Sequence, residues 1–225
     1  MALVLRISSV EAGVYGALRD DIVRLAFAPG RRLGFDELSD RYGVSHTPIR
    51  QALRRLQGER LVVLAPRRGA RVALLTFDEL EEIQAVRLGV EPLLAGYAAR
   101  ACLPKTLAAM ERRLAEIDAA MRERHLDHYL EAYREFRDTC YSGAGKAGLH
   151  RVVREQRRRV ERYLRFLCDN VEALGVSRNH QDSLLQACFT RNSEAAEAAT
   201  REALWWTLGR LASLLDMKSG ANAVS

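Results

Sequence analysis

The chain has 225 residues, of which 48% are hydrophobic and 28% are charged, so it is long and apolar enough to bury one or two ordinary cores. A formal net charge of +6 and a pI near 9.4 favour a polyanionic partner, because Lys and Arg neutralise phosphates. No apolar run approaches the length of a membrane span, and the apolar run in the first ten residues is too short for a secretory leader. We therefore expect a cytoplasmic protein that makes no contact with a membrane.

The four cysteines are too far apart to form a metal knuckle or a redox pair. They are Cys102, Cys140, Cys168 and Cys188, and none belongs to a Cys-x-x-Cys motif. Such spacing favours buried, reduced thiols.

The first predicted helix covers residues 14–25, where apolar residues recur at helical spacing, and Ala28-Pro29-Gly30 ends it. Residues 34–56 then have the pattern of a helix-turn-helix. Leu38 anchors the first short helix, and Gly43 stands just after it, where a left-handed backbone is needed. Ser45 is placed to cap the second helix, and Pro48 falls in its first turn. The residues expected to face inward on this second helix are Ile49, Ala52, Leu53 and Leu56.

The opposite side of the second helix is polar and basic. An α-helix fits the major groove of DNA, and the N-terminal residues of the second helix touch base edges in helix-turn-helix proteins. We expect the base contacts at Ser45, His46, Thr47 and Arg50, with Arg54 and Arg55 also pointing outward. The alternative is a three-helix scaffold whose arginines form a solvated face.

Residues 58–74 are predicted to form a hairpin with a basic tip. Two β-prone runs flank the turn Pro66-Arg67-Arg68-Gly69. Such a wing would lay Arg67 and Arg68 along a phosphate backbone or into a minor groove. The predicted DNA-binding residues are Ser45, His46, Thr47, Arg50, Arg54, Arg67, Arg68 and Gly69.

A domain boundary is predicted at residues 75 and 76. Thr76-Phe77-Asp78-Glu79 is a capping box, and helical periodicity replaces strand periodicity there. We expect a winged helix-turn-helix domain over 1–75, an all-α effector-binding and dimerisation domain over 76–218, and a frayed tail over 219–225. The fold class is therefore mainly α. The predicted helices of the second domain cover residues 76–94, 103–124, 126–141, 149–170, 176–190 and 193–217.

The predicted helix 149–170 is strongly basic. Its apolar side carries Val152, Val153, Val160, Leu164 and Leu167. Its arginines are expected on a solvated or dimer-facing surface rather than at a second DNA site, and they are Arg154, Arg157, Arg158, Arg159 and Arg162.

Several stretches of the first third carry a family resemblance. They are Ala28-Pro29-Gly30-Arg31-Arg32-Leu33, Glu37-Leu38, Gly43-Val44-Ser45-His46-Thr47-Pro48-Ile49-Arg50-Gln51-Ala52-Leu53-Arg54-Arg55-Leu56 and Arg68-Gly69-Ala70-Arg71-Val72. They look like the winged helix-turn-helix of the GntR family of bacterial transcription regulators. His46 departs from the family, which commonly has arginine there. A neutral His46 gives up a charge at the groove, so an operator preference cannot be copied from other members.

The second domain is similar to the FCD effector domain of the FadR-like subgroup. The stretches that carry this resemblance are Val86-Arg87-Leu88-Gly89-Val90-Glu91-Pro92-Leu93-Leu94-Ala95 and Arg191-Asn192-Ser193-Glu194-Ala195-Ala196. Many FCD domains hold a divalent metal through an Asp and three His. The residues that fall at those positions are Tyr133, Arg137, Gln181 and Ala203.

None of these four residues is a good metal ligand, so the family's metal site is expected to be lost and no cofactor is expected. His180 lies one residue from Gln181, which turns its side chain by about 100° on a helix. It could substitute only through a local bulge.

The loss of the metal site suggests direct recognition of an anion. An inward-pointing Arg137 requires an anionic partner or water, because a buried unpaired charge is very costly. The candidate effector residues are Arg87, Tyr133, Arg137, His180 and Gln181, acting on a small carboxylate or phosphate metabolite. In the alternative, Tyr133 fills the old cavity and Arg137 pairs at the domain surface with Glu135, Asp138 or Glu202.

Trp205 and Trp206 cannot both face the core of one helix. One of them is expected to cover a ligand mouth or an interface, and the alternative is core packing with partial exposure.

The sequence therefore predicts a DNA-binding transcriptional regulator, more often a repressor in this family. A homodimer would bind a palindromic operator of double-stranded DNA, and a small anionic metabolite would modulate that binding. The alternative is an effector-independent dimeric DNA-binding protein whose helical domain only dimerises. An enzyme is not expected, since no triad, carboxylate pair or phosphate loop occurs.

Overall fold

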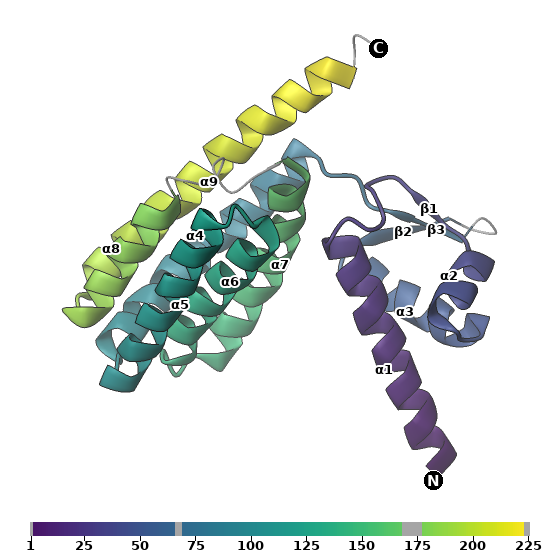
Figure 1. Cartoon of the computed structure of the whole chain (residues 1–225), viewed down its shortest axis with the longest axis horizontal. Helices are drawn as coiled ribbons and strands as arrows, with labels where there is room; N and C mark the ends of the chain where they lie inside the picture. The colour runs from purple at the N-terminus through teal and green to yellow at the C-terminus, as the bar shows by residue number, and fades with distance from the viewer. Residues whose placement is uncertain (1, 66–68, 168–176, 223–225) are drawn as a thin grey trace. The chain divides into compact units, whose positions relative to one another are not determined.

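The computed structural model of the chain describes residues 2–65, 69–167 and 177–222 (Figure 1). The chain divides into two compact units, residues 1–75 and 76–225. The first combines helices with a small sheet, and the described part of the second is helical. The predicted fold class, a winged helix-turn-helix followed by an all-α bundle, is confirmed.

The first unit is a winged helix-turn-helix. Its elements are α1 (Ala2–Val23), β1 (Arg32–Leu33), α2 (Phe35–Tyr42), α3 (His46–Gly58), β2 (Val62–Ala65) and β3 (Gly69–Val72). The strands form one antiparallel sheet in the order β1-β3-β2, with Leu64 opposite Ala70 in the hairpin. Leu18, Leu38 and Leu53 join the buried side chains of the sheet in one apolar core.

Helix α1 differs from its predicted limits of residues 14–25. It begins at Ala2 and ends at Val23, and Leu25 already has a left-handed backbone with φ of 62°. The helix therefore ends before Pro29 is reached. Val14, Leu18 and Ile22 form its buried side, as the predicted periodicity requires.

The turn between α2 and α3 has the predicted glycine geometry. Gly43 adopts a left-handed conformation with φ of 65°, and its N–H donates to the carbonyl of Ser39. The predicted inner face of α3, from Ile49 to Leu56, is buried. Ser45 occupies the N-cap position, but its side chain makes no capping hydrogen bond. The third residue of the helix is Pro48, which has no N–H to donate, so the preferred partner of the Ser45 hydroxyl is missing.

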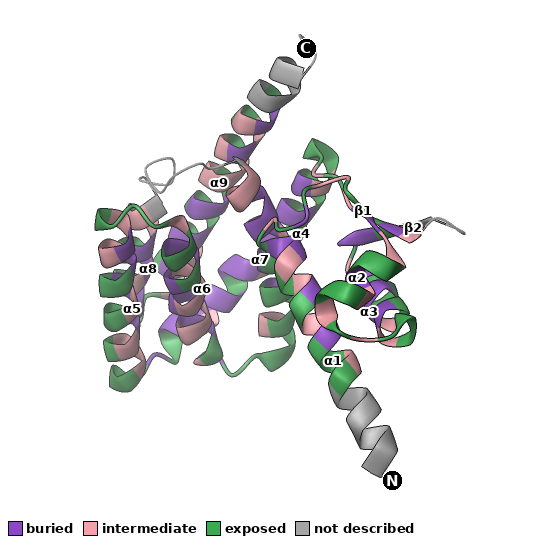
Figure 2. Ribbon diagram, turned by 45° about the vertical axis from the view of Figure 1, so that its right-hand side comes forward, coloured by how far each residue is buried: buried purple, intermediate pink, exposed green. Residues whose placement is uncertain are grey.

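The second unit is a helical bundle centred on α4. Its elements are α4 (Phe77–Arg100), α5 (Pro104–Arg122), α6 (Leu126–Ser142), α7 (Ala147–Leu167), α8 (Ser177–Phe189) and α9 (Ser193–Asn222). Helix α4 packs against α6, α7, α8 and α9. Figure 2 shows the buried residues on the sides of these helices that face one another, where Leu94, Phe136 and Leu184 contribute to the core.

Helix α9 extends past its predicted end at residue 217, into the segment 219–225 that was expected to be a frayed tail. The helix continues to Asn222, and residues 223–225 lie outside the described part. A single glycine costs a helix only about 1 kcal/mol and no proline follows, so α9 can continue through Gly220. The predicted ends at residues 170 and 176 also lie outside the described residues.

Three of the four cysteines are free and buried, namely Cys102, Cys140 and Cys188, as the sequence predicts for them. Burial raises the pKa of the Cys102 thiol to about 11. The sulfur atoms of Cys140 and Cys188 lie 3.7 Å apart. Cys168 lies outside the described residues.

Candidate functional site

The outward face of α3 is the first candidate site. Ser45, His46, Thr47, Arg50 and Arg54 are all exposed there, on the side away from the buried apolar residues of the helix. Five of the predicted DNA-binding residues are thus accessible together on one short helix. The exposed side chains are a histidine, a serine, a threonine and two arginines, all of which can hydrogen-bond to base edges in a DNA major groove.

Two residues at the start of α2, Phe35 and Asp36, contact this face, and the sequence analysis did not identify either. The Nε2 atom of His46 lies 3.0 Å from Oδ1 of Asp36. The Phe35 ring lies 5.9 Å from the His46 ring, and the Arg50 guanidinium lies 5.6 Å from the centre of the Phe35 ring. The Phe35 ring therefore limits the motion of the His46 and Arg50 side chains in the protein without bound DNA.

Arg55 is exposed, as predicted, but it does not share the direction of Arg50 on the helix. Its guanidinium stacks 3.7 Å from the centre of the Tyr15 ring on α1. Five residues along an α-helix turn a side chain by about 140°, so Arg50 and Arg55 point in different directions.

Gly69 has a structural role at the start of β3, directly after the tip of the wing. It has φ of 83°, and a Cβ atom there would lie 2.8 Å from the carbonyl oxygen of Leu33. A side chain at this position would separate β1 from β3. The two tip arginines of the prediction, Arg67 and Arg68, lie outside the described residues.

The second candidate site lies inside the bundle, where the family resemblance placed a metal. Arg137, Gln181 and Ala203 are buried, and Tyr133 is half-buried. Within the described residues, no group of three or more His, Cys, Asp or Glu side chains is arranged to hold a metal ion. A guanidinium and a phenol at these positions do not fit a divalent cation.

His180 does not take the place of a ligand. Helix α8 is regular through both His180 and Gln181, and Gln181 is the fully buried one. The Nδ1 atom of His180 has no hydrogen-bond partner within the described part of the chain. Burial, together with the charge of Arg137, lowers the pKa of His180.

Arg137 points into the bundle and is only 1% exposed. Its Nη1 atom lies 3.1 Å from the hydroxyl of Tyr141 and 3.5 Å from Oγ1 of Thr200. The Tyr141 hydroxyl donates to the carboxylate of Glu91 at 3.0 Å. Burial works against the charge of Arg137, but Tyr141, Tyr133 and Glu91 outweigh it and raise its pKa.

The alternative in which Arg137 pairs at the domain surface is therefore wrong. Glu135 pairs instead with Arg113 at 2.7 Å, and Asp138 accepts from Arg157 at 3.3 Å. Arg137 lies on the buried side of α6, and its side chain therefore enters the core instead of pairing with these acids.

Two further buried arginines share Glu91. Arg87 donates to its carboxylate at 2.8 Å, and the Nε atom of Arg157 lies 4.0 Å away. Burial raises the pKa of Glu91, but the arginines outweigh it and keep the pKa below the usual value, so the carboxylate is charged. Three guanidiniums thus surround one carboxylate.

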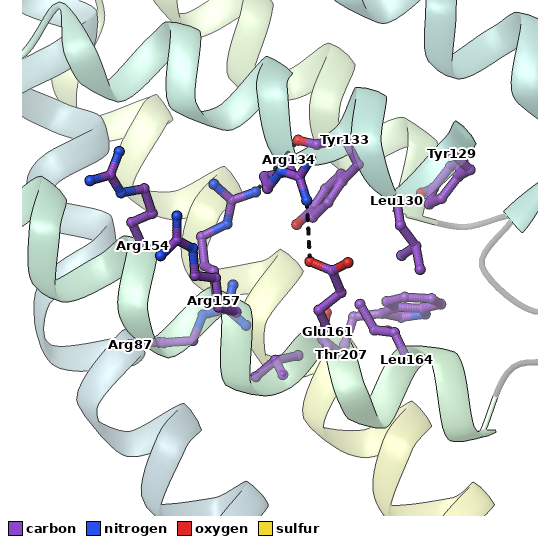
Figure 3. A pocket seen from close by; sticks show the side chains of 13 residues that line it. Arg87, Tyr129, Leu130, Tyr133, Arg134, Arg154, Arg157, Glu161, Leu164 and Thr207 are labelled. Atoms are coloured by element: carbon purple, nitrogen blue, oxygen red, sulfur yellow. Dashed lines mark hydrogen bonds and ion pairs between the residues drawn. The ribbon is translucent and has the colours of Figure 1, made fainter. Parts of the chain in front are cut away.

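A small cavity of about 40 Å³ opens beside this cluster. Arg87, Arg154 and Arg157 lie together at one end, and Tyr129, Leu130 and Leu164 lie at the other, with Tyr133 and Glu161 between them (Figure 3). Of the five predicted effector residues, only Arg87 and Tyr133 line the cavity. Arg137 does not line the cavity, and its guanidinium lies 5.7 Å from the centre of the Tyr133 ring.

Helix α7 corrects the prediction that its arginines form a solvated or dimer-facing surface. Arg157 and Arg162 are buried, and Arg159 pairs with Glu79 at 3.1 Å. Only Arg154 and Arg158 of this group are exposed. The spacing of Val153, Arg157 and Val160 already placed Arg157 on the apolar side of the helix.

The two tryptophans separate as expected for neighbours on one helix. Trp206 lines the cavity, whereas Trp205 is 58% exposed. Trp206 also lies 5.9 Å from the His180 ring, which places α8 close to the cavity wall.

On α7, Val152 is exposed, so the prediction that it belongs to the apolar side of this helix is wrong.

Comparisons with known proteins agree with both units. The model of bacterial regulatory proteins of the gntR family matches residues 11–72, and the FCD domain model matches residues 82–204. The HTH-type transcriptional repressor RspR of Escherichia coli K12 is 25% identical over 195 residues, covering 87% of this chain and 86% of that protein. The repressor GlaR of the same strain is 28% identical over 198 residues, covering 84% and 90%.

Solved structures share the fold. E. coli McbR/YncC has a TM-score of 0.80 at 23% identity, covering 91% of this chain and 97% of that one. A putative GntR regulator from Rhodococcus sp. RHA1 has a TM-score of 0.77 at 21% identity, covering 91% of this chain and 98% of that one.

No helix in the described ranges is long and apolar enough to span a bilayer. The relatives are transcription regulators rather than enzymes, and the FCD match alone spans more than half of the chain. The chain belongs to the GntR family of bacterial transcription regulators, with a DNA-binding helix-turn-helix followed by an FCD domain.

Proposed function

We propose that this regulator is a cytoplasmic homodimeric repressor that reads a palindromic operator and changes its DNA affinity when a small anionic metabolite binds the FCD domain. The exposed face of α3 carries the DNA part of this proposal, because His46, Thr47 and Arg50 stand together and are restrained by α2. Two such faces related by a two-fold axis would match two half-sites. RspR and GlaR are both named repressors, which supports repression rather than activation by this protein.

The effector part rests on the charge of the bundle interior. Arg87, Arg137 and Arg157 are buried around Glu91, and the partly exposed Asp138 adds a second carboxylate beside Arg157. Buried guanidiniums in excess of carboxylates favour an anionic ligand. Such a ligand regulates DNA binding only if it binds one arrangement of the dimer better than the other.

The rival proposal is a dimeric DNA-binding protein without an effector. The contacts of Arg137 with Tyr141 and Thr200 favour it, because they supply part of the hydrogen bonding that a buried guanidinium needs. A thermal-shift screen of metabolite acids, run with and without EDTA, separates the two. Stabilisation by an acid that EDTA leaves unchanged supports sensing without a metal. Loss of stability in EDTA alone would contradict it.

The DNA face is tested by substitutions on α3 and on the wing. With an operator selected from random DNA, Arg50→Ala is expected to weaken specific binding by about 1–3 kcal/mol if Arg50 reads a base. Arg55→Ala is the matched control, because Arg55 stacks on Tyr15 and should leave specific binding unchanged. Arg67→Ala should weaken binding to all DNA sequences by a similar factor and reduce the dependence of DNA affinity on salt concentration. Equal losses from Arg50→Ala and Arg55→Ala would contradict the proposed base contact.

A further inference from the structure

The cavity beside Glu91 has a charged end and an apolar end. Arg87, Arg154 and Arg157 lie on one side of it, and Tyr129, Leu130 and Leu164 lie on the other (Figure 3). Tyr129 and Leu130 are almost fully buried, so their surfaces toward the cavity belong to the apolar core. A ligand that fills both ends must be amphipathic.

The charge available to a ligand at the cationic end is small. Arg87 and Arg157 are engaged by Glu91 and Asp138, and Arg134 lies 3.7 Å from Glu161. Arg154 is exposed and makes no hydrogen bond or ion pair with any residue that the structure describes. Arg158, the fifth arginine that lines the cavity, also has an interaction partner. Within the described residues Arg154 is thus the free guanidinium of the cavity, and one free guanidinium suits a single negative charge better than a dianion.

The middle of the cavity is an aromatic wall flanked by cations. The Tyr133 ring lies 5.4 Å from the Arg157 guanidinium and 5.7 Å from that of Arg137. It also stacks parallel to the Tyr129 ring at 6.2 Å. Flat faces of this kind accept an aromatic or short aliphatic group alongside the charged end.

From this polarity we infer that the effector is a small amphipathic monocarboxylate. Its carboxylate meets Arg154 and the Arg87–Arg157 pair, and its aromatic or aliphatic body contacts Tyr129, Leu130 and Leu164. The inference rests on the proposed effector response, which it narrows to a ligand class. The cavity of about 40 Å³ exceeds the roughly 10–15 Å³ that a cavity needs to hold one water, so it has room for a small group such as a carboxylate. The body of the ligand requires the cavity to widen at its apolar end, beside Tyr129, Leu130 and Leu164.

The test measures binding of defined probes to the full-length protein by calorimetry, with thermal shift as a second readout. Benzoate, 3-phenylpropionate and hexanoate carry both parts of the inferred ligand. Benzamide lacks the charge, acetate lacks the body, and succinate and inorganic phosphate carry more charge. At least one of the three apolar acids should bind tenfold or more tightly than acetate, succinate and phosphate, and benzamide should not bind.

Two variants assign the binding to this cavity. Arg154→Ala should weaken the tightest apolar acid by about 10- to 100-fold, the range expected for one charge-assisted contact. Arg151→Ala is the matched control, because Arg151 is exposed one turn earlier on α7 and does not line the cavity. Both variants should keep the melting temperature of the unliganded protein, which separates lost binding from lost folding.

The outcomes separate this inference from the proposed function. Tighter binding of succinate or phosphate than of every apolar acid would overturn the ligand class while leaving an anionic effector in place. Equal effects of Arg154→Ala and Arg151→Ala would overturn the assignment to this cavity. If no probe binds, the amphipathic ligand class is rejected, whereas the effector response fails only if the screen of metabolite acids also finds none that changes DNA affinity.

Discussion

The hydroxyl of Tyr163 on α7 lies 2.9 Å from the carbonyl oxygen of Thr76 and 2.7 Å from a carboxylate oxygen of Glu79. It also accepts a hydrogen bond from the Thr76 N–H at 3.3 Å. Thr76 caps α4 by accepting from the Glu79 N–H at 3.2 Å, so half of the predicted capping box is present and Tyr163 takes over the other half. Helix α7 thereby links the cavity residues Arg157 and Leu164 to the first residues of the FCD unit.

Tyr163→Phe should uncouple effector binding from DNA binding. Removing the hydroxyl leaves the Thr76 N–H without this acceptor and should lower the free energy of unfolding by about 1–3 kcal/mol. Affinity for an acid effector should persist, whereas the change that it causes in operator affinity should shrink. Urea unfolding and DNA titrations with and without the acid measure both.

Tyr97→Phe serves as the control for Tyr163→Phe, because the Tyr97 hydroxyl makes no hydrogen bond with the described residues. Tyr97→Phe should change neither the free energy of unfolding nor the effect of the acid on operator affinity. An unchanged regulatory response in Tyr163→Phe would reject this route of coupling.

Gly69→Ala should destabilise the winged unit. The substitution forces a left-handed residue and brings a Cβ atom to 2.8 Å from the Leu33 carbonyl oxygen. We expect a loss of about 1–3 kcal/mol, of the size that backbone strain typically costs. Gly58→Ala is the matched control, since no heavy atom within 4 Å crowds that position, and it should be neutral or stabilise by up to about 1 kcal/mol. Chemical denaturation distinguishes them, and similar effects of both would contradict the wing geometry.

The charge cluster should tolerate the loss of an arginine better than the loss of its carboxylate. Glu91→Gln leaves Arg87 and Arg157 buried without their shared anion, so we expect a loss of about 3–5 kcal/mol in unfolding free energy. Arg137→Met removes one positive charge from a site with a positive excess and keeps the apolar volume. It should cost less than about 1.5 kcal/mol. A larger cost for Arg137→Met than for Glu91→Gln would show that the cluster is not cation-rich.

His180 should make the protein less stable in mild acid. Burial and Arg137 lower the pKa of His180 in the folded state, while Glu202 acts weakly in the opposite direction. Below the unfolded value of about 6.5 the unfolded chain therefore binds the proton better, and stability falls with pH by at most about 1.4 kcal/mol per unit. Because the ring is only half-buried, the effect should be smaller than this limit.

His180→Gln provides the comparison. The difference in unfolding free energy between wild type and variant, measured from pH 7.5 to 5.5, should change in favour of the variant as pH falls. A difference that is constant over this range would reject the lowered pKa.

The sequence by itself determined the winged helix-turn-helix and the change to a helical unit near residue 76. These features depend on local chemistry: a glycine after α2, apolar spacing along α3 and a threonine cap on α4. Each acts within a few residues, so the pattern can be read along the chain.

Tertiary structure decided which arginines of the FCD unit are buried and which one faces the cavity freely. Arg154 and Arg157 are three residues apart on one basic helix, yet only Arg157 meets the carboxylates of Glu91 and Asp138. Those acids come from α4 and α6, and a guanidinium is buried only where distant acids compensate for its lost hydration. The spacing of residues within α7 does not specify the pairing of Arg157 with Glu91 and Asp138. The cavity therefore could not be predicted from the sequence and follows from the packing of the helices.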